Sequence, residues 1–250
     1  KAAAYDLPLY LEKPVAVTMR QATALERAFE NSACAAVVSF PLRVSPLCLL
    51  AKGYLGKGSV GAPVHICAVN YVPYGRVYWE KPYRDYDITR GLFLQKATHD
   101  FDYMSYLMDC PIVRVGAMAT RGQIFGGDKP AGLVCSQCGE QETCLESPQN
   151  RQRRGTGHDQ SQDHHCVFSV DCGSGHRLNE DCSSATIEFA SGAHGTYTQV
   201  FFSLKGAASR GASISGYDGL ISFDWYTNEM RYLRHHEPFA ATEGAGEGAS

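Results

Sequence analysis

The sequence predicts an α/β fold whose second half is rich in strands, and three patterns support this. The chain begins with an apolar run at residues 7–17, followed at 19–33 by a segment with helical periodicity and at 34–40 by a second apolar run. Strand, helix and strand in this order form a βαβ unit, which belongs to a parallel sheet covered by helices. A second helix is expected at residues 91–108, and residues 184–204 alternate around SGAHG as a β-hairpin does.

The periods of the individual segments define these elements. Apolar residues recur at helical spacing in the first helix at Ala22, Leu25 and Phe29. A short helical segment is expected after PLRVSP, and Gly and Pro in GSVGAP predict a turn before a strand from about Val64 to Val72. Residues 111–120 follow the second helix as a strand, and residues 210–235 add further strands after the hairpin.

Composition excludes some classes of protein. The chain has 250 residues, 44% of them hydrophobic, which suffices for one large domain or two small ones. A net charge of −3 with mixed signs lacks the basic field that nucleic-acid binding needs. No apolar stretch approaches the ~20 residues that span a bilayer, and no signal peptide is visible. We therefore expect neither a nucleic-acid partner nor a membrane partner.

Ten unevenly spaced cysteines favour a reducing, cytoplasmic setting over a disulfide framework. Six of them crowd between Cys135 and Cys182. Most of these lie in a polar stretch at about 122–166, which we expect to be a long irregular insertion. Cys135-x2-Cys138 is a common half-site for tetrahedral zinc, and two further thiolates would close a structural site. The proposed ligands are Cys135, Cys138, Cys144 and Cys166, with His164 or His165 as substitutes for the last. Free thiols, an iron–sulfur cluster and disulfides are the alternatives.

Five segments occur in an order that carries a family resemblance. They are LEKPVAVT (11–18), VVSFPLRVSP (37–46), GSVGAP (58–63), GLFLQKATHDFDYM (91–104) and SISGYDGLISFD (213–224). The set resembles the glucose-fructose oxidoreductase / inositol dehydrogenase / rhizopine catabolism (Gfo/Idh/MocA) family of NAD(P)-dependent oxidoreductases. The similarity runs from about residue 7 to 236.

The resemblance implies a division of the chain. Residues 1–42 would be the end of a Rossmann-type dinucleotide-binding domain. Residues 43–238 would be a substrate-binding α/β domain with a mixed, largely antiparallel open sheet and the Cys-rich insertion. The low-complexity residues 239–250 are expected to be a disordered tail. The Gly-rich phosphate loop of the family is not in these residues, so we expect the chain to be a fragment of a longer protein.

The resemblance also implies roles for single residues. Lys13 and His99 would be catalytic, and the turn Glu12, Lys13 and Pro14 would face the nicotinamide of NAD or NADP. Pro14 would fix the direction of Lys13. Gln95 is proposed to bind the substrate. It stands where the family commonly has Asp, so acid–base chemistry would depend on Lys13 and His99. The other proposed substrate-binding residues are Lys96, Asp102, Arg43 and Trp79. The alternatives are a solvated surface turn for Lys13 and a core position for His99.

These observations predict an NAD(P)-dependent oxidoreductase. It would act on a sugar, a polyol or a derivative by hydride transfer at a CH–OH group. The rival interpretation is a non-catalytic ligand-binding or sensing module of the same fold. We also expect a cytoplasmic homo-oligomer that associates through the open face of its sheet.

Overall fold

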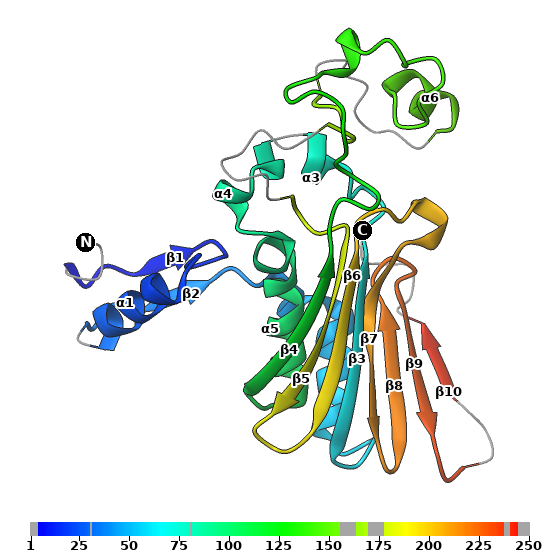
Figure 1. Cartoon of the computed structure of the whole chain (residues 1–250). Coiled ribbons are helices and arrows are strands. Elements are labelled where there is room, and N and C mark those ends of the chain that lie inside the picture. The colour runs from blue at the N-terminus through cyan, green and yellow to red at the C-terminus, as the bar shows by residue number, and fades with distance from the viewer. Residues whose placement is uncertain are drawn as a thin grey trace.

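The computed structural model describes residues 5–30, 32–80, 82–155, 164–169, 178–237 and 241–244. Near the N-terminus, β1 (Leu9–Leu11) and β2 (Ala36–Val38) pair in parallel. The connection between them contains α1 (Met19–Glu30). The predicted βαβ unit is therefore confirmed, and it stands to one side of the main sheet (Figure 1).

The main sheet has eight strands in the order β10-β9-β8-β7-β3-β6-β5-β4. Their bounds are β3 (Pro63–Tyr71), β4 (Ile112–Thr120), β5 (Cys182–Phe189), β6 (His194–Val200), β7 (Ser209–Gly216), β8 (Gly219–Asp224), β9 (Glu229–Arg234) and β10 (Ala241–Gly244). The central pair β3–β6 is parallel, and every other pair is antiparallel. This is the mixed, largely antiparallel sheet that the sequence predicted, including the hairpin β5–β6.

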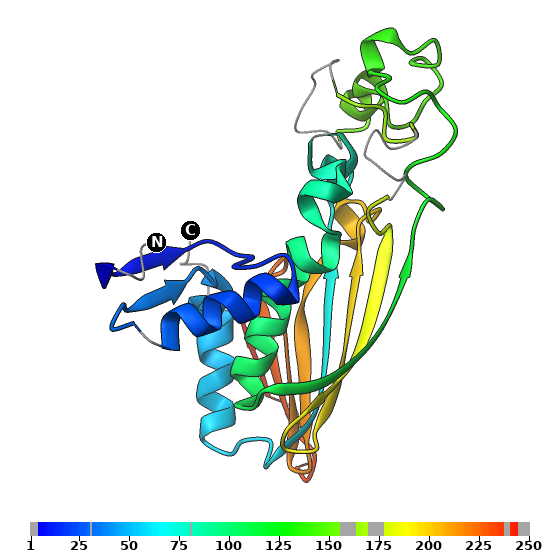
Figure 2. The same ribbon diagram turned by 60° about the vertical axis from the view of Figure 1, so that its left-hand side comes forward.

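Two helices, α2 (Pro46–Gly56) and α5 (Thr98–Met108), cover one face of this sheet and leave the other face open (Figures 1 and 2). Strands such as β3 and β6 alternate buried and more exposed residues, so the main core forms between the helices and one side of the sheet. The edge strand β4 is exposed along most of its length. The expected helix at 91–108 begins instead with a π-helical turn, η4 (Phe93–Ala97). Such turns are frequent at functional sites.

Short elements connect β3 to α5 and carry a second, smaller core. They are α3 (Val77–Glu80), η3 (Pro82–Arg84) and α4 (Tyr86–Thr89), and η2 (Pro41–Val44) precedes α2. The second core contains Trp79, Phe125 and Phe201, whose rings contact one another. It attaches the insertion to the ends of β3 and β6.

The insertion is mostly irregular where the structure describes it, with η5 (Cys135–Gln137) and α6 (Pro148–Arg153) as its short helices. Because the insertion has few apolar residues of its own, hydrogen bonds to buried polar side chains fix its backbone in place. Asp181 is fully buried and accepts hydrogen bonds from the backbone N–H groups of residues 123, 124 and 125. Arg84 donates to the backbone carbonyls of Trp79, Cys166 and Ser169.

The C-terminal segment differs in part from the expectation. Residues 241–244, within the predicted disordered tail, form β10 and pair with β9 at the sheet edge. The remaining residues of the predicted tail, 239–240 and 245–250, lie outside the described residues.

Candidate active site

Lys13 links the βαβ unit to the main domain. It lies in the turn that follows β1, at the carboxyl end of a parallel strand, where α/β sheets bind their ligands. Its peptide bond to Pro14 is cis. The Lys13 Nζ donates a hydrogen bond of 2.8 Å to the backbone carbonyl of Gln95, in the π-helical turn. Burial and then the charge of Lys96 lower the pKa of Lys13.

Lys96 is a second ammonium group at this place. Its Nζ lies 3.2 Å from the Tyr74 hydroxyl, 5.2 Å from the centre of the Tyr74 ring and 5.5 Å from that of Tyr78. Burial opposes its charge, but the phenol oxygens of Tyr78 and Tyr74 outweigh this effect and raise the pKa of Lys96. It is therefore charged at neutral pH.

His99 lies one residue into the first turn of α5 and is half-buried. Its ring meets Phe40 edge-on, with 6.0 Å between ring centres. Burial, followed by the charges of Lys13, Arg210 and Lys96, lowers the pKa of His99 to about 4. The buried Nδ1 has no hydrogen-bond partner among the described residues. His99 is thus a neutral imidazole with an unused nitrogen, beside two lysines.

A buried ion pair lies beneath this cluster. Asp100, next to His99, is fully buried and accepts hydrogen bonds from two nitrogens of the Arg210 guanidinium, Nε at 3.1 Å and Nη2 at 3.0 Å. Tyr197 and Asn70 also donate to the Asp100 carboxylate. The sequence analysis missed this group, because it joins residues 110 positions apart in the chain. The presence of a charged residue on the apolar face of α5 was the feature that could have pointed to it.

Three predicted substrate-binding residues are engaged elsewhere. Arg43 and Asp102 form a bidentate ion pair with 2.6 and 2.7 Å separations, which joins η2 to α5. Trp79 is 1% exposed and belongs to the second core, so its ring is not at a surface that a substrate could contact. These side chains stabilise the fold around the site. Gln95 stays beside Lys13 through its backbone carbonyl.

The position of residues 12–14 in the fold is compatible with the predicted contact to a nicotinamide. It follows a parallel strand, Glu12 is exposed, and the unpartnered nitrogen of His99 lies on the facing helix. Glu12, Lys13 and Pro14 are the residues that would contact this part of the cofactor.

The predicted zinc site is not formed by the described residues. Nowhere in the described ranges do three or more His, Cys, Asp or Glu side chains group in a way that holds a metal ion. Two of the proposed ligands are neighbours: the Cys138 N–H donates to the Cys135 carbonyl, and the Cys135 N–H donates to the carbonyl of His164, a proposed substitute ligand. Burial and then the neighbouring Cys166 raise the pKa of Cys135 to about 11. The nine described cysteines are all free.

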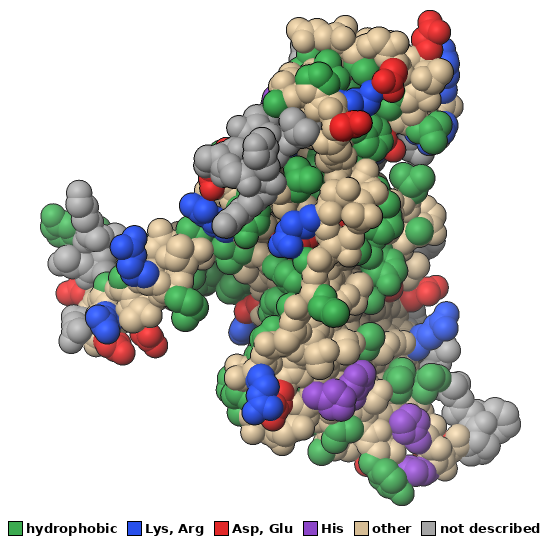
Figure 3. Space-filling view, in the orientation of Figure 1, with side chains coloured by type: hydrophobic (Ala, Val, Ile, Leu, Met, Phe, Trp, Pro, Cys, Tyr) green, Lys and Arg blue, Asp and Glu red, His purple; other side chains and the backbone are tan. Residues whose placement is uncertain are grey.

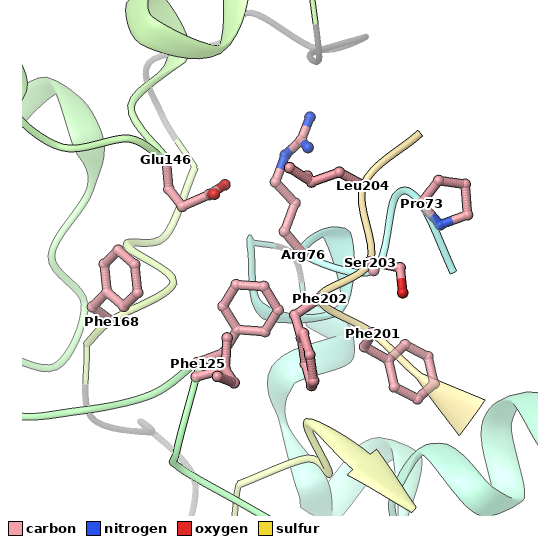
Figure 4. A pocket seen from close by; sticks show the side chains of 11 residues that line it. Pro73, Arg76, Phe125, Glu146, Phe168, Phe201, Phe202, Ser203 and Leu204 are labelled. Atoms are coloured by element: carbon pink, nitrogen blue, oxygen red, sulfur yellow. The ribbon is translucent and has the colours of Figure 1, made fainter. Parts of the chain in front are cut away.

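A separate cavity of about 190 Å³ opens between the insertion and the segments that follow β3 and β6 (Figure 4). Phe125, Phe201 and Phe202 lie on one side of it and Arg76 on another. It is smaller than the ~300–1,000 Å³ of ordinary ligand sites. None of the predicted site residues lines it.

Fold and site together define an open-sheet α/β domain with a lysine–histidine cluster where it meets a βαβ unit. The chain belongs to the GFO/IDH/MocA family, whose C-terminal domain model matches residues 49–222. This confirms the resemblance that the five sequence segments carried. No curated protein matches the chain by sequence. Among the described residues, none of the helices has the length and apolar character needed to cross a membrane.

Solved structures share the fold at low sequence identity. A levoglucosan dehydrogenase in complex with NADH and levoglucosan is 17% identical with a TM-score of 0.67, covering 98% of this chain and 56% of that one. An NAD-binding oxidoreductase from Klebsiella pneumoniae is 19% identical with a TM-score of 0.66, covering 97% and 55%. An oxidoreductase domain protein from Kribbella flavida is 17% identical with a TM-score of 0.65, covering 95% and 55%. The chain thus spans little more than half the length of these relatives.

Proposed function

We propose that this chain provides the substrate site of an NAD(P)-dependent oxidoreductase acting on a CH–OH group of a sugar, a polyol or a derivative. One contact carries the proposal: the Lys13 side chain donates a hydrogen bond to the π-helical turn that precedes His99, and the two bonded residues are 82 positions apart in the sequence. Membership of the GFO/IDH/MocA family supports it, and so do structural neighbours described as NAD-binding or complexed with NADH.

Lys13 and His99 have complementary tasks in this reaction. The Lys13 ammonium donates a hydrogen bond to the substrate oxygen and stabilises negative charge as the O–H proton leaves. The neutral His99 imidazole accepts that proton. When bound, the nicotinamide supplies the acceptor for the hydride that leaves the same carbon, so that the alcohol becomes a carbonyl. The tyrosines around Lys96 offer hydroxyl groups and ring faces to a sugar.

The test is turnover by the full-length protein that contains this chain. Lys13→Met should lower kcat by about 10²-fold, the usual scale for losing a positioned acid–base group. Lys57→Met is the matched control, because Lys57 lies at the end of α2 and contacts the Tyr54 ring instead of the site. Formation of NADH or NADPH is followed by absorbance. A near-normal kcat for Lys13→Met would contradict the assignment.

The rival function is a ligand-binding module without catalysis. Gln95, in place of the carboxylate expected from the family resemblance, favours it, because an amide cannot act as a base. The rival predicts saturable sugar binding by the full-length protein with no reduction of NAD or NADP in the presence of any sugar or polyol.

A cytoplasmic homo-oligomer is the last part of the proposal. Free thiols at all nine described cysteines support a reducing compartment. The open face of the sheet supports self-association. One row of residues crosses seven strands on this face: Gly116, Thr186, Thr196, Cys67, Ser213, Ser222 and Arg231. All but the last are small and uncharged. In Figure 3 this face is mostly tan and green.

A further inference from the structure

The candidate site holds two ammonium groups that no carboxylate neutralises. Within the part of the chain that the structure describes, neither Lys13 nor Lys96 forms an ion pair, and their hydrogen bonds go to a backbone carbonyl and a phenol. Glu12 is the acidic residue whose charge acts on Lys13, and it is exposed. The site therefore has a positive field.

The other charged groups nearby are already paired. Asp100 is neutralised by Arg210, and Asp102 is neutralised by Arg43. None of these carboxylates is available to the two lysines. Half-buried charges lose part of their hydration, so a site that keeps two of them without a counter-ion favours a ligand that brings one.

Polar and aromatic groups surround this field. Lys96 lies over the rings of Tyr74 and Tyr78. Tyr226 lies near Tyr74, and burial together with the Tyr74 hydroxyl raises the pKa of Tyr226 to about 12. Neutral phenols donate hydrogen bonds and present ring faces without adding negative charge. This setting suits a polyhydroxylated ring or chain that carries an acidic group.

We propose that the substrate is an acidic sugar derivative, whose carboxylate or phosphate binds Lys96 while its reacting hydroxyl lies between Lys13 and His99. The inference rests on the proposed function and names the substrate class within it. Lys96 is then the residue that selects for charge. Gln95, which is neutral, leaves this positive field intact where a carboxylate would reduce it.

The proposal has a consequence for His99. Three cations act on this imidazole, and two of them, Lys13 and Lys96, form no ion pair among the described residues. A bound anion would offset these charges and return the pKa of His99 toward its ordinary value near 6.5. The substrate would thus improve the base that accepts its own proton.

The experiment compares matched probes on the full-length protein. D-glucuronate and D-galacturonate are paired with their neutral amides, and glucose 6-phosphate is paired with glucose, which separates carboxylate from phosphate. We expect kcat/KM for an acidic probe to exceed that of its neutral partner by about 10-fold or more, as for other charged hydrogen bonds. Lys96→Met should remove most of this ratio, and Lys57→Met should leave it unchanged.

Binding gives a readout that does not need turnover. The His99 imidazole is followed by NMR, and its titration midpoint should rise with the acidic probe and stay unchanged with the neutral one. Equal kcat/KM for both members of every pair, or a Lys96→Met variant with an unchanged ratio, would overturn the inference and leave the oxidoreductase function in place. Acidic probes that bind and shift His99 but never reduce NAD or NADP would instead reject the proposed function and keep the charge preference.

Discussion

His99 shows how neighbouring charges set the chemistry of one residue. An ordinary imidazole is half protonated near pH 6.5, and would be a mixture of acid and base at physiological pH. Here burial and the cations around it keep the ring neutral. A neutral ring accepts a proton, which is the direction that alcohol oxidation requires. The same two lysines that would bind an acidic substrate therefore also hold His99 in its basic form.

This makes the pH behaviour of His99 testable. In the folded chain its pKa is about 4, whereas the unfolded chain takes up the same proton near 6.5. Because the unfolded state binds more protons between these values, the contribution of His99 to stability is complete above pH 6.5 and decreases as the pH falls toward 4. NMR titration should give a midpoint near 4. Lys13→Gln should raise this midpoint, because it removes the largest charge effect on the ring, and an unchanged midpoint would contradict that cause.

The structure gives several of the proposed site residues partners that the sequence analysis did not foresee, for a physical reason. Lys13 and His99 were proposed from the family resemblance, and their catalytic roles stay predictions. Asp102 was chosen for lying three residues after His99, yet its carboxylate pairs with Arg43, 59 residues away in the sequence. A charged side chain bonds to the partner that the fold supplies. Local spacing does not show that partner, and it likewise missed Arg210.

At the scale of elements, the Asp100–Arg210 pair fixes α5 to β7. Asp100 projects from the helix into the main core, and Arg210 reaches it from the sheet. The ion pair sets the distance of α5 from the strands. It therefore also positions His99, which precedes Asp100 in the sequence. Sequence periods correctly predicted α5 and the strands of the main sheet up to β9, but they could not predict how the two are attached. The attachment is a buried polar contact between distant segments.

Breaking this pair should destabilise the fold strongly. Arg210→Met leaves the Asp100 carboxylate buried without its cation, which typically costs about 3–5 kcal/mol of unfolding free energy. The double variant Asp100→Asn with Arg210→Met should recover a large part of this loss, because no uncompensated charge remains. Urea unfolding followed by circular dichroism measures both.

The exposed pair Arg114–Glu188 is the matched control for the buried one. It links β4 to β5 with both side chains largely in solvent. Glu188→Gln should therefore change stability by less than about 1 kcal/mol. Equal losses from Arg210→Met and Glu188→Gln would show that the buried pair does not hold α5 in place.

At the scale of the whole molecule, the two faces of the sheet have different tasks. One face carries α2 and α5 and, through them, the active-site cluster. Among the described residues the other face carries no helix, and the row through its centre is small and uncharged from β4 to β8. Antiparallel sheets often leave such a face free. Eight strands about 4.8 Å apart and on average about seven residues long give a face of roughly 34 by 23 Å. That is close to the ~800 Å² per partner of stable protein interfaces.

We therefore expect the full-length protein to form dimers through this face, and a single charge at its centre should prevent them. Thr196 lies on β6, and its register neighbours are Cys67 on β3 and Thr186 on β5. Thr196→Arg would bury an unpaired guanidinium in the dimer, while in the monomer the side chain would extend into solvent, so the fold should persist. Light scattering should give twice the monomer mass for the parent protein and for Lys57→Glu, and the monomer mass for Thr196→Arg. A dimer that survives Thr196→Arg with an unchanged dissociation constant would show that association uses a different surface, because an unpaired charge at the centre of an interface cannot be accommodated without loss of affinity.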